Sequence, residues 1–278
     1  MSGIHKLRTK DGIPTIKNYL DLIESNDFKE VEAYSDKFIG KVGEKIQSYN
    51  NKWVPDPLHQ WSRQWEYIYI IDQVLKTQKA RQKVLDLGAG MTFLPYYLQE
   101  LKNVDTVTAL DYDASLAGLY DKVNKALAKK VEFRFADIRK LAKEKTESYD
   151  YIYSVSVLEH TDNYGEIVKN CYKLLKKGGK FSITFDISLD GNDDIPLKKA
   201  GQLMDSIQST FKLKKDLKKL IDVEKKIVRS DEVIKNISKD LMPWKYPLLN
   251  VIKPMLKKGR PGSRYKKLTF CCVSVKKS

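Results

Sequence analysis

One nine-residue run, Val84 to Thr92 (Val-Leu-Asp-Leu-Gly-Ala-Gly-Met-Thr), constrains the fold more than any other part of the chain. Its first four residues are mostly aliphatic, as in a buried strand, and Gly88 and Gly90 permit a tight turn directly after it. Phe93–Leu101 then shows the apolar spacing of a helix. A ligand lying across such a turn meets backbone N–H groups and the positive end of a helix. The run therefore predicts a site for a nucleotide-like or adenosine-containing molecule.

Alternating strand and helix patterns extend from residue 82 to the C-terminal region. Short apolar runs separated by amphipathic stretches, such as Ser115–Ala128 and Tyr164–Leu175, are typical of repeated βα units around a parallel sheet with helices on both faces. Seven strands are expected, the sixth of them at Phe211–Leu217. The others are Val84–Leu87, Val107–Asp111, Val131–Phe135, Tyr151–Val155, Lys180–Phe185 and Leu268–Val275.

Two regions lie outside this alternation. Residues 1–76 are predicted to form an N-terminal helical cap that contributes to substrate binding, ahead of a domain over residues 77–278. A lysine-rich, helical insert is expected at about 218–265, before the last strand. Long insertions near strand ends often form the walls of substrate sites.

Charge and cysteine content limit the partners and the compartment. The chain has 51 Lys and Arg against 36 Asp and Glu, a formal charge of +15, which fits either an anionic partner or a solvated lysine-rich surface. Its three cysteines, Cys171, Cys271 and Cys272, have no metal-ligand spacing, so no metal is expected and a reducing cytoplasm is favoured. No signal-peptide pattern and no run long enough for a membrane span is visible.

Acidic residues follow the second and third predicted strands. Asp111 stands about twenty residues after Gly90, where a carboxylate can accept hydrogen bonds from ribose hydroxyls. Asp137 follows the third strand and is placed to meet an adenine amino group, with Ile138 packing on the ring. Either residue alone is more often a helix cap or a surface carboxylate than a ligand contact, but their order along the chain favours a shared site.

With these motifs the chain resembles the class I S-adenosylmethionine-dependent methyltransferases. The matching segments are Val84–Thr92, Val107–Asp111, Phe135–Ile138, Tyr149–His160 and Leu174–Lys180. The resemblance implies a Rossmann-like, seven-stranded, mostly parallel sheet and S-adenosyl-L-methionine as cofactor. A dinucleotide oxidoreductase is disfavoured, because its G-x-G-x-x-G pattern is broken where Phe93 stands.

The same resemblance implies the cofactor contacts. Asp86, Gly88 and Gly90 are expected around the methionine part, Asp111 at the ribose and Asp137 at the adenine. Thr92 stands where many members have a third glycine, and its hydroxyl is expected to reach the cofactor carboxylate. The further expected cofactor contacts are Tyr112, Ile138, Ser154 and Arg63.

Methyl transfer from a sulfonium is an in-line displacement in which positioning dominates and a base helps a hydroxyl acceptor. His160, just past the fourth strand, is the first candidate base, and His59 is the second. An alternative for His160 is a structural role at the start of the next helix.

His59–Tyr67 is similar to an N-terminal element of methyltransferases from bacterial surface-polysaccharide (capsule) pathways. Within it, Arg63 is expected to clamp a carboxylate or phosphate and Trp61 to stack on a sugar or base. The alternative is an amphipathic helix packed into the core. The full set of expected acceptor contacts is Trp61, Arg63, Glu66, Tyr67 and Asp186.

These observations favour an O-methyltransferase acting on a small anionic or nucleotide-linked acceptor, at a sugar hydroxyl or a phosphate- or phosphoramidate-type oxygen, in surface-polysaccharide biosynthesis. The fourth strand is not followed by the Asn-Pro-Pro-Tyr-like motif of base amine methylation, so nucleic acid is a less favoured acceptor. An RNA methyltransferase and a non-catalytic module that binds S-adenosylmethionine remain the two alternatives. Neither the acceptor nor the oligomeric state follows from the sequence.

Overall fold

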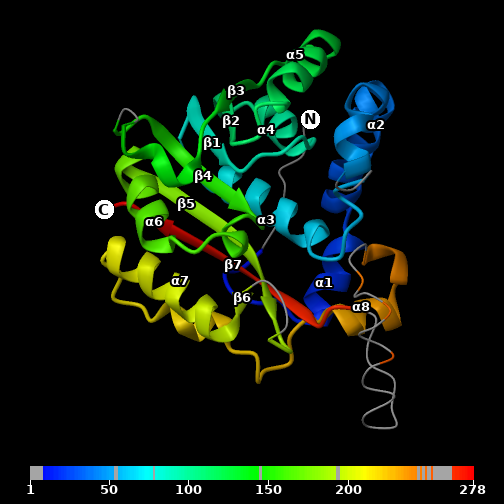
Figure 1. Ribbon diagram of the computed structural model, residues 1–278, viewed down its shortest axis with the longest axis vertical. Helices are drawn as coiled ribbons and strands as arrows, with labels where there is room; N and C mark the ends of the chain where they lie inside the picture. Colours follow the sequence, from blue (N-terminus) through cyan, green and yellow to red (C-terminus); the bar gives the residue numbers. More distant parts are fainter. Residues whose placement is uncertain are drawn as a thin grey trace.

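A seven-stranded sheet runs through the molecule, with helices packed on both of its faces (Figure 1). The computed structural model describes residues 9–52, 56–77, 79–143, 146–191, 195–242, 245, 248, 252 and 265–278. The strands are β1 (Gln82–Leu87), β2 (Val104–Asp111), β3 (Glu132–Phe135), β4 (Tyr149–Val155), β5 (Leu175–Ser188), β6 (Ile195–Pro196) and β7 (Leu268–Lys276). Their order is β3-β2-β1-β4-β5-β6, all in parallel pairs, and β7 pairs antiparallel with β5. The predicted mostly parallel seven-stranded sheet is confirmed.

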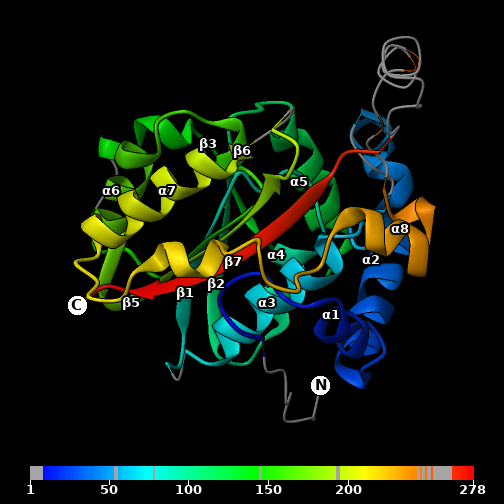
Figure 2. The ribbon, with the colours of Figure 1, turned by 90° about the horizontal axis from the view of Figure 1, so that it is seen from below.

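The helices divide between the two faces of the sheet. Figure 2 shows α6 (Tyr164–Leu174) and α7 (Leu197–Thr210) on one side and α3 (Arg63–Leu75) on the other. The face with α3 also carries α4 (Leu94–Glu100) and α5 (Leu116–Ala126). The remaining helices are α1 (Ile16–Ile23), α2 (Asn26–Lys52) and α8 (Ser230–Asn236), with 3-10 turns η1 (Ile138–Lys143), η2 (Leu158–His160), η3 (Leu217–Ile221) and η4 (Lys239–Leu241). None of the helices in the described residues is long and apolar enough to cross a membrane.

Alternate residues of each central strand enter two separate cores, because successive side chains of a strand point to opposite faces. Val84 joins the core under α3, α4 and α5, whereas Leu85 and Leu87 join the core under α6 and α7. On β7, Cys272 enters the first core and Cys271 the second, as their adjacent positions predict. Burial on both faces explains why these strands read as short, mostly apolar runs.

The sixth strand lies elsewhere than predicted. Phe211 ends α7, and Leu217 begins η3, so Phe211–Leu217 forms no strand. The Phe211 ring instead packs on Tyr172 and Phe181, which shows that its apolar side chain covers the sheet rather than extending it. The observed sixth strand is the two-residue β6, which pairs with Ile187 and Ser188 of β5.

The N-terminal region is helical, as expected, and is tied to the region before the last strand. The Trp61 N–H donates to the Leu241 carbonyl (3.0 Å), and α1 packs against both α2 and α3. Within the described part of residues 218–265 the regular elements are helical, as predicted. The domain boundary at residue 76 stays a prediction.

Candidate functional site

The glycine turn joins β1 to α4 at the carboxyl edge of the sheet, as the sequence predicts. Gly88 and Gly90 have φ of +73° and +54°, the left-handed region that favours glycine. A Cβ added to Gly88 would lie 2.6 Å from the Val157 side chain, and one added to Gly90 would collide with the Tyr49 hydroxyl. Both positions therefore require glycine for space as well as for backbone conformation.

Asp111 fastens this turn to the end of β2. Its Oδ2 accepts from the Gly90 N–H (2.9 Å), and its Oδ1 accepts from the Asp113 N–H (3.0 Å). The Tyr120 hydroxyl donates to the Gly90 carbonyl (3.0 Å) from the α5 side. Each carboxylate oxygen can accept more than one hydrogen bond, so Asp111 retains acceptor capacity toward a ligand hydroxyl.

Asp86 lies one layer below the turn in a buried position. The Tyr153 hydroxyl donates to its Oδ2 (2.8 Å). Burial raises the pKa of Asp86 to about 8, an effect that the Tyr153 hydrogen bond only partly offsets. A buried carboxyl with such a pKa is suited to receive a cation, because a positive charge beside it stabilises its ionised form.

At the end of β3 the pKa of an aspartate is lowered, whereas that of Asp86 is raised. Arg139 pairs with Asp137 (2.7 Å) and lowers the pKa of that carboxyl to about 2, so it is charged at neutral pH. Ile138 beside it is buried, while Tyr112 and Phe135 expose broad aromatic side chains. Because Phe135 stands in register with Asp111, an apolar and acidic rim adjoins the glycine turn.

A second group, the carboxylate cluster, lies at the ends of β4 and β5; it comprises Glu66, Glu159 and Asp186 with Arg63 and Ser156. Arg63 pairs with Glu66 and donates to the Ser156 hydroxyl oxygen, and the Ser156 hydroxyl donates to Glu66 (2.9 Å). The Asp186 N–H donates to Glu159 Oε1 (3.3 Å).

The carboxylate cluster buries more acid than base. Glu66, Glu159 and Asp186 are each less than a tenth exposed, and Arg63 is their one buried cationic partner in the cluster. Burial and the neighbouring Asp186 raise the pKa of Glu159 well above its usual range. Oε2 of Glu159 has no hydrogen-bond partner among the described residues. The cluster is therefore equipped to accept a proton or to face a cationic group.

The backbone is strained at Ser156, whose side chain contacts two other members of the cluster. Its φ is +48°, a region that non-glycine residues seldom occupy, and its N–H donates to the Thr184 carbonyl (3.0 Å). Such outliers cost of the order of 1–3 kcal/mol and gather at functional sites. This conformation directs the hydroxyl group of Ser156 toward both Arg63 and Glu66.

Several residues that were expected to contact the cofactor or the acceptor are instead buried and contact other parts of the protein. Trp61 is fully buried and its ring meets Phe270 edge-on (5.2 Å between centroids), which corrects the expectation that it stacks on a sugar or base. Tyr67 is buried and packs edge-on against Phe93. Ser154 is fully buried and donates to the Leu87 carbonyl (2.9 Å), tying β4 to β1.

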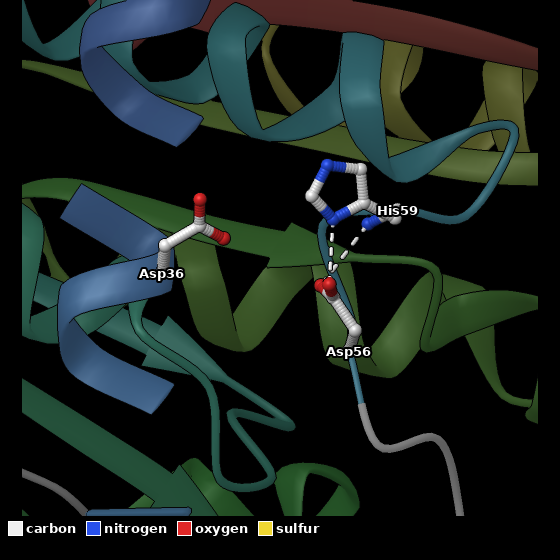
Figure 3. Close-up of side chains that lie close together, drawn as sticks. All are labelled: Asp36, Asp56 and His59. Carbon is white, nitrogen blue, oxygen red and sulfur yellow. Dashed lines mark hydrogen bonds and ion pairs between the residues drawn. The ribbon is translucent and has the colours of Figure 1, made fainter. Parts of the chain in front are cut away.

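The two candidate bases differ in their surroundings. His160 is exposed at the end of η2, where its N–H donates to the Val157 carbonyl (3.1 Å). The ring of His59 lies between Asp56 (2.6 Å) and Glu32 (2.8 Å), and Figure 3 shows its contact with Asp56. These carboxylates raise the pKa of His59 to about 9, so the ring is protonated at neutral pH and cannot accept another proton. The role of His160 stays a prediction.

Asp36, Asp56 and His59 also place potential metal ligand atoms within 4.8 Å of one another (Figure 3). Both ring nitrogens of His59 already face carboxylates, and a doubly protonated imidazole has no lone pair to offer a cation. The geometry of this group is that of an ion-paired histidine.

The central part of the chain is similar to known methyltransferases. Residues 85–183 match the family model described as a methyltransferase domain. A mitochondrial ubiquinone biosynthesis O-methyltransferase of Rattus norvegicus is 24% identical over 173 residues, 58% of this chain and 46% of that protein. Phosphoethanolamine N-methyltransferase 3 of Arabidopsis thaliana is 35% identical over 107 residues, 38% of this chain and 21% of that protein. The chain spans less than half the length of these curated relatives.

Among solved structures, phosphoethanolamine N-methyltransferase 2 of Haemonchus contortus in complex with S-adenosyl-L-methionine aligns with a TM-score of 0.47 at 16% identity. The alignment covers 88% of this chain and 60% of that one. The region of the family match, residues 85–183, runs from β1 into β5 and includes both the glycine turn and Glu159. That region is a methyltransferase domain.

Proposed function

We propose that this chain, whose residues 85–183 form a methyltransferase domain, is an S-adenosylmethionine-dependent methyltransferase acting on a small-molecule acceptor. The observation that carries the proposal is the hydrogen bond from the Gly90 N–H to Asp111, which joins the two strand ends where a bound ribose would lie. Gly88 and Gly90 form a cradle that any Cβ would fill, and this cradle suits the backbone approach of a bound molecule.

The described residues fit each part of that cofactor. Asp86 would face its amino group, Asp111 its ribose hydroxyls, and Asp137 with Ile138 its adenine ring. When bound, S-adenosylmethionine supplies the methyl group that is transferred. The protein would position the cofactor and the acceptor, exclude part of the solvent, and supply the group that accepts the proton.

The carboxylate cluster supports an acceptor whose reacting atom is a hydroxyl oxygen or an amine nitrogen. The cluster holds three buried carboxyl groups, and its guanidinium, Arg63, is already paired with Glu66, so a phosphate-type oxygen is the least favoured of the expected acceptor groups. A carboxyl whose pKa is raised by burial is a suitable base for a hydroxyl or a protonated amine near neutral pH. The relatives named above include one O-methyltransferase and one N-methyltransferase, which is consistent with either atom.

The surface-polysaccharide assignment depends on the resemblance of His59–Tyr67 alone. Arg63 is committed to Glu66 and Ser156, and Trp61 is buried, so this segment supports the site rather than presenting free groups to a sugar. A sugar hydroxyl on a nucleotide-linked acceptor stays a prediction.

Calorimetric titration with S-adenosylmethionine, followed by a screen of hydroxyl- and amine-bearing metabolites for release of S-adenosylhomocysteine, tests the proposal. We expect saturable 1:1 binding and turnover with at least one acceptor class. Absence of cofactor binding would refute the proposal. Binding without turnover of any acceptor would favour the non-catalytic module.

The role of Glu159 has its own test. With an acceptor in hand, Glu159→Gln should lower kcat by about 100-fold, the usual contribution of a positioned acid or base, and leave cofactor affinity within about twofold. His160→Ala is the companion variant. If Glu159→Gln retains full turnover while His160→Ala loses it, the base is His160 and not the carboxylate cluster.

A further inference from the structure

A cavity of about 500 Å³ lies away from the methyl-transfer site and is lined by five lysines. They come from separate parts of the chain: the N-terminal segment, the end of α3, β5, the loop after α7, and β7. In order they are Lys10, Lys76, Lys180, Lys215 and Lys276. Lys180 of β5 pairs with Tyr151 near the start of β4, whereas the glycine turn follows the end of β1. The cavity therefore lies toward the opposite edge of the sheet from the candidate cofactor site.

Negative charge around this lysine-lined cavity is smaller than the positive charge. Asp11 lines it and accepts from the Tyr69 hydroxyl (2.6 Å), and the buried Asp72 pairs with Lys76 (2.6 Å). Lys76 also donates to the Thr9 carbonyl (3.2 Å). Five lysines against these two carboxylates leave an excess of three positive charges beside one cavity.

Lys180 lies close enough to two of the other lysines for its own charge to be disfavoured. Lys180 is half-buried, and its burial together with the positive charges of Lys76 and Lys276 lowers its pKa, although Asp11 and Asp72 act in the other direction. An anion in the cavity would relieve this repulsion, because opposite charges within a few ångströms favour the charged forms of both groups.

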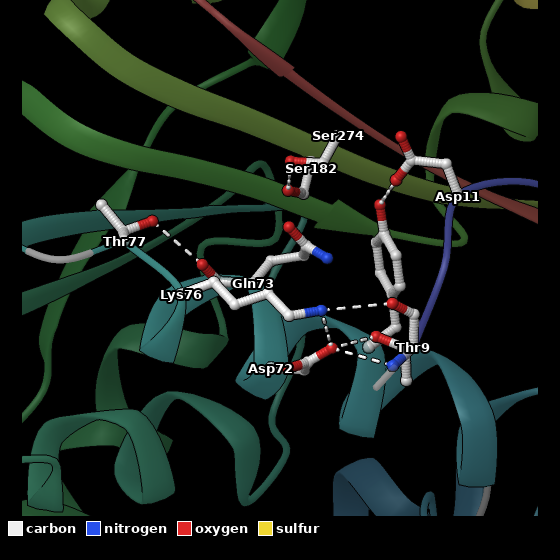
Figure 4. Close-up of polar contacts among 9 residues, drawn as sticks. Thr9, Asp11, Asp72, Gln73, Lys76, Thr77, Ser182 and Ser274 are labelled. Carbon is white, nitrogen blue, oxygen red and sulfur yellow. Dashed lines mark hydrogen bonds and ion pairs between the residues drawn. The ribbon is translucent and has the colours of Figure 1, made fainter. Parts of the chain in front are cut away.

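Neutral donors lie among the lysines. Figure 4 shows the Gln73 side chain reaching toward Ser182 and Ser274. The Ser182 hydroxyl donates to Ser274 Oγ (2.8 Å), so the Ser274 proton can be donated elsewhere. Gln73 and Ser274 both line the cavity. Ammonium, amide and hydroxyl donors around one small volume are the groups that bind phosphate oxygens.

We propose that the lysine-lined cavity, next to Gln73 and Ser274, binds a small phosphorylated molecule at a site distinct from that of methyl transfer. Its volume falls within the range of about 300–1,000 Å³ that small-molecule pockets occupy. Lysine suits this role, because its compact ammonium group binds phosphate as a point charge without a fixed fork geometry. The site is independent of the methyltransferase proposal, since neither the cofactor nor the acceptor takes part in it.

Inorganic pyrophosphate is the probe, titrated calorimetrically into the full chain at low ionic strength and at about 0.15 M salt, where exposed charges are screened over about 8 Å. We expect saturable 1:1 binding. The double variant Lys180→Met with Lys276→Met should bind at least tenfold more weakly. The matched control is Lys218→Met with Lys225→Met, which removes two lysines that pair with Asp205 and Asp222 outside the cavity. It should stay within twofold of the parent.

Ser274→Asp provides a second route, because it places a carboxylate in the cavity while leaving every lysine present. It should also weaken pyrophosphate binding at least tenfold. Unchanged far-UV circular dichroism and thermal unfolding of the variants would show that their fold is intact. Equal pyrophosphate affinity in all variants, or no saturable binding by the parent, would overturn the proposal. So would displacement of pyrophosphate by tRNA in proportion to its charge, which would indicate a nucleic-acid surface.

Discussion

At the scale of single residues, the surroundings of each aspartate in the site determine its pKa, since the carboxyl group itself is the same. Asp86 is buried beside Tyr153 and its pKa is raised to about 8, whereas Asp137 is held by Arg139 and its pKa falls to about 2. Asp137 is therefore a permanent charge, while Asp86 changes its charge near neutral pH. Two aspartates in one site can thus respond differently to the same ligand.

The titration of Asp86 predicts a pH dependence of cofactor binding. A cationic cofactor binds the ionised carboxylate, so the affinity advantage of the wild type over Asp86→Asn should grow as pH rises from 6 to 8, by about tenfold. The ratio of the two dissociation constants isolates Asp86, because the amino group of the cofactor titrates equally in both experiments. Calorimetry at each pH measures it. A ratio that is independent of pH would mean that Asp86 does not face the cationic part.

Asp111 carries the second residue-scale prediction. Asp111→Ala removes the side-chain acceptor of the Gly90 N–H and of the expected ribose hydroxyls, which should weaken S-adenosylmethionine binding by about 10- to 100-fold. Asp121→Ala, an exposed substitution on α5, is the matched control and should leave the dissociation constant unchanged. Equal affinity of the two variants would remove Asp111 from the cofactor site.

Sequence reasoning located the glycine turn and its following carboxylates because their spacing along the chain is regular. It did not include Tyr49 or Ser156 among the site residues. Tyr49 lies near the end of the long helix α2, and its hydroxyl lies next to Gly90. Ser156 has a positive φ, which cannot be predicted from its residue type. Trp61 was expected at the ligand because aromatic residues that bind sugars and aromatic residues in cores have the same sequence pattern.

At the scale of elements, α3 links the N-terminal helices to the site. Its first turn supplies Arg63 and Glu66 to the carboxylate cluster, and the segment before it is held to α2 through His59 and Glu32. The position of the cluster therefore depends on how this preceding segment is anchored. The polar residues His59, Arg63 and Glu66 of this run therefore position the cluster through contacts with other protein groups.

The His59 link predicts a pH-dependent contribution to stability. The pKa of His59 is raised from 6.5 to about 9, so its stabilising effect is complete below pH 6.5 and is lost as pH rises through 9. His59→Gln should lower the free energy of unfolding by about 1 kcal/mol at pH 6.5, a value reduced for the partial exposure of the pair. Denaturant titrations at pH 6.5 and pH 10 measure the difference. It should vanish at pH 10; persistence there would show that packing, not charge, is responsible.

The strands were predictable where burial on two faces makes them continuous apolar runs. Phe211–Leu217 has only three apolar residues among four charged ones, and it forms no strand; the ring of Phe211 packs on the sheet from outside. Gly178 and Gly179 lie in an irregularity inside β5, between the pairings of Leu175 with Tyr149 and of Lys180 with Tyr151.

At the scale of the whole molecule, the charge distribution separates two kinds of site. The chain carries a net charge of +15, yet the carboxylate cluster, which we propose as the site of methyl transfer, holds three acidic side chains and one basic one. An anionic partner is therefore attracted to the molecule as a whole but not to the position where the nucleophile must lie. The lysine-lined cavity at the opposite edge of the sheet gathers part of that excess positive charge around a volume of about 500 Å³.

This separation predicts that RNA is not the acceptor. An RNA methyltransferase would neutralise several phosphates, and its affinity would fall steeply with salt, by about 10³–10⁵ between 50 and 200 mM for 6–10 contacts. A polyanionic backbone reaching the carboxylate cluster would meet three buried carboxyl groups, and the guanidinium of the cluster, Arg63, already pairs with Glu66 and is not available to bind a phosphate. We expect filter binding with tRNA to show only weak association at 50 mM salt and none at 200 mM. Methyl transfer from labelled S-adenosylmethionine to tRNA, together with tight binding at 50 mM salt, would show that the small-molecule assignment is wrong.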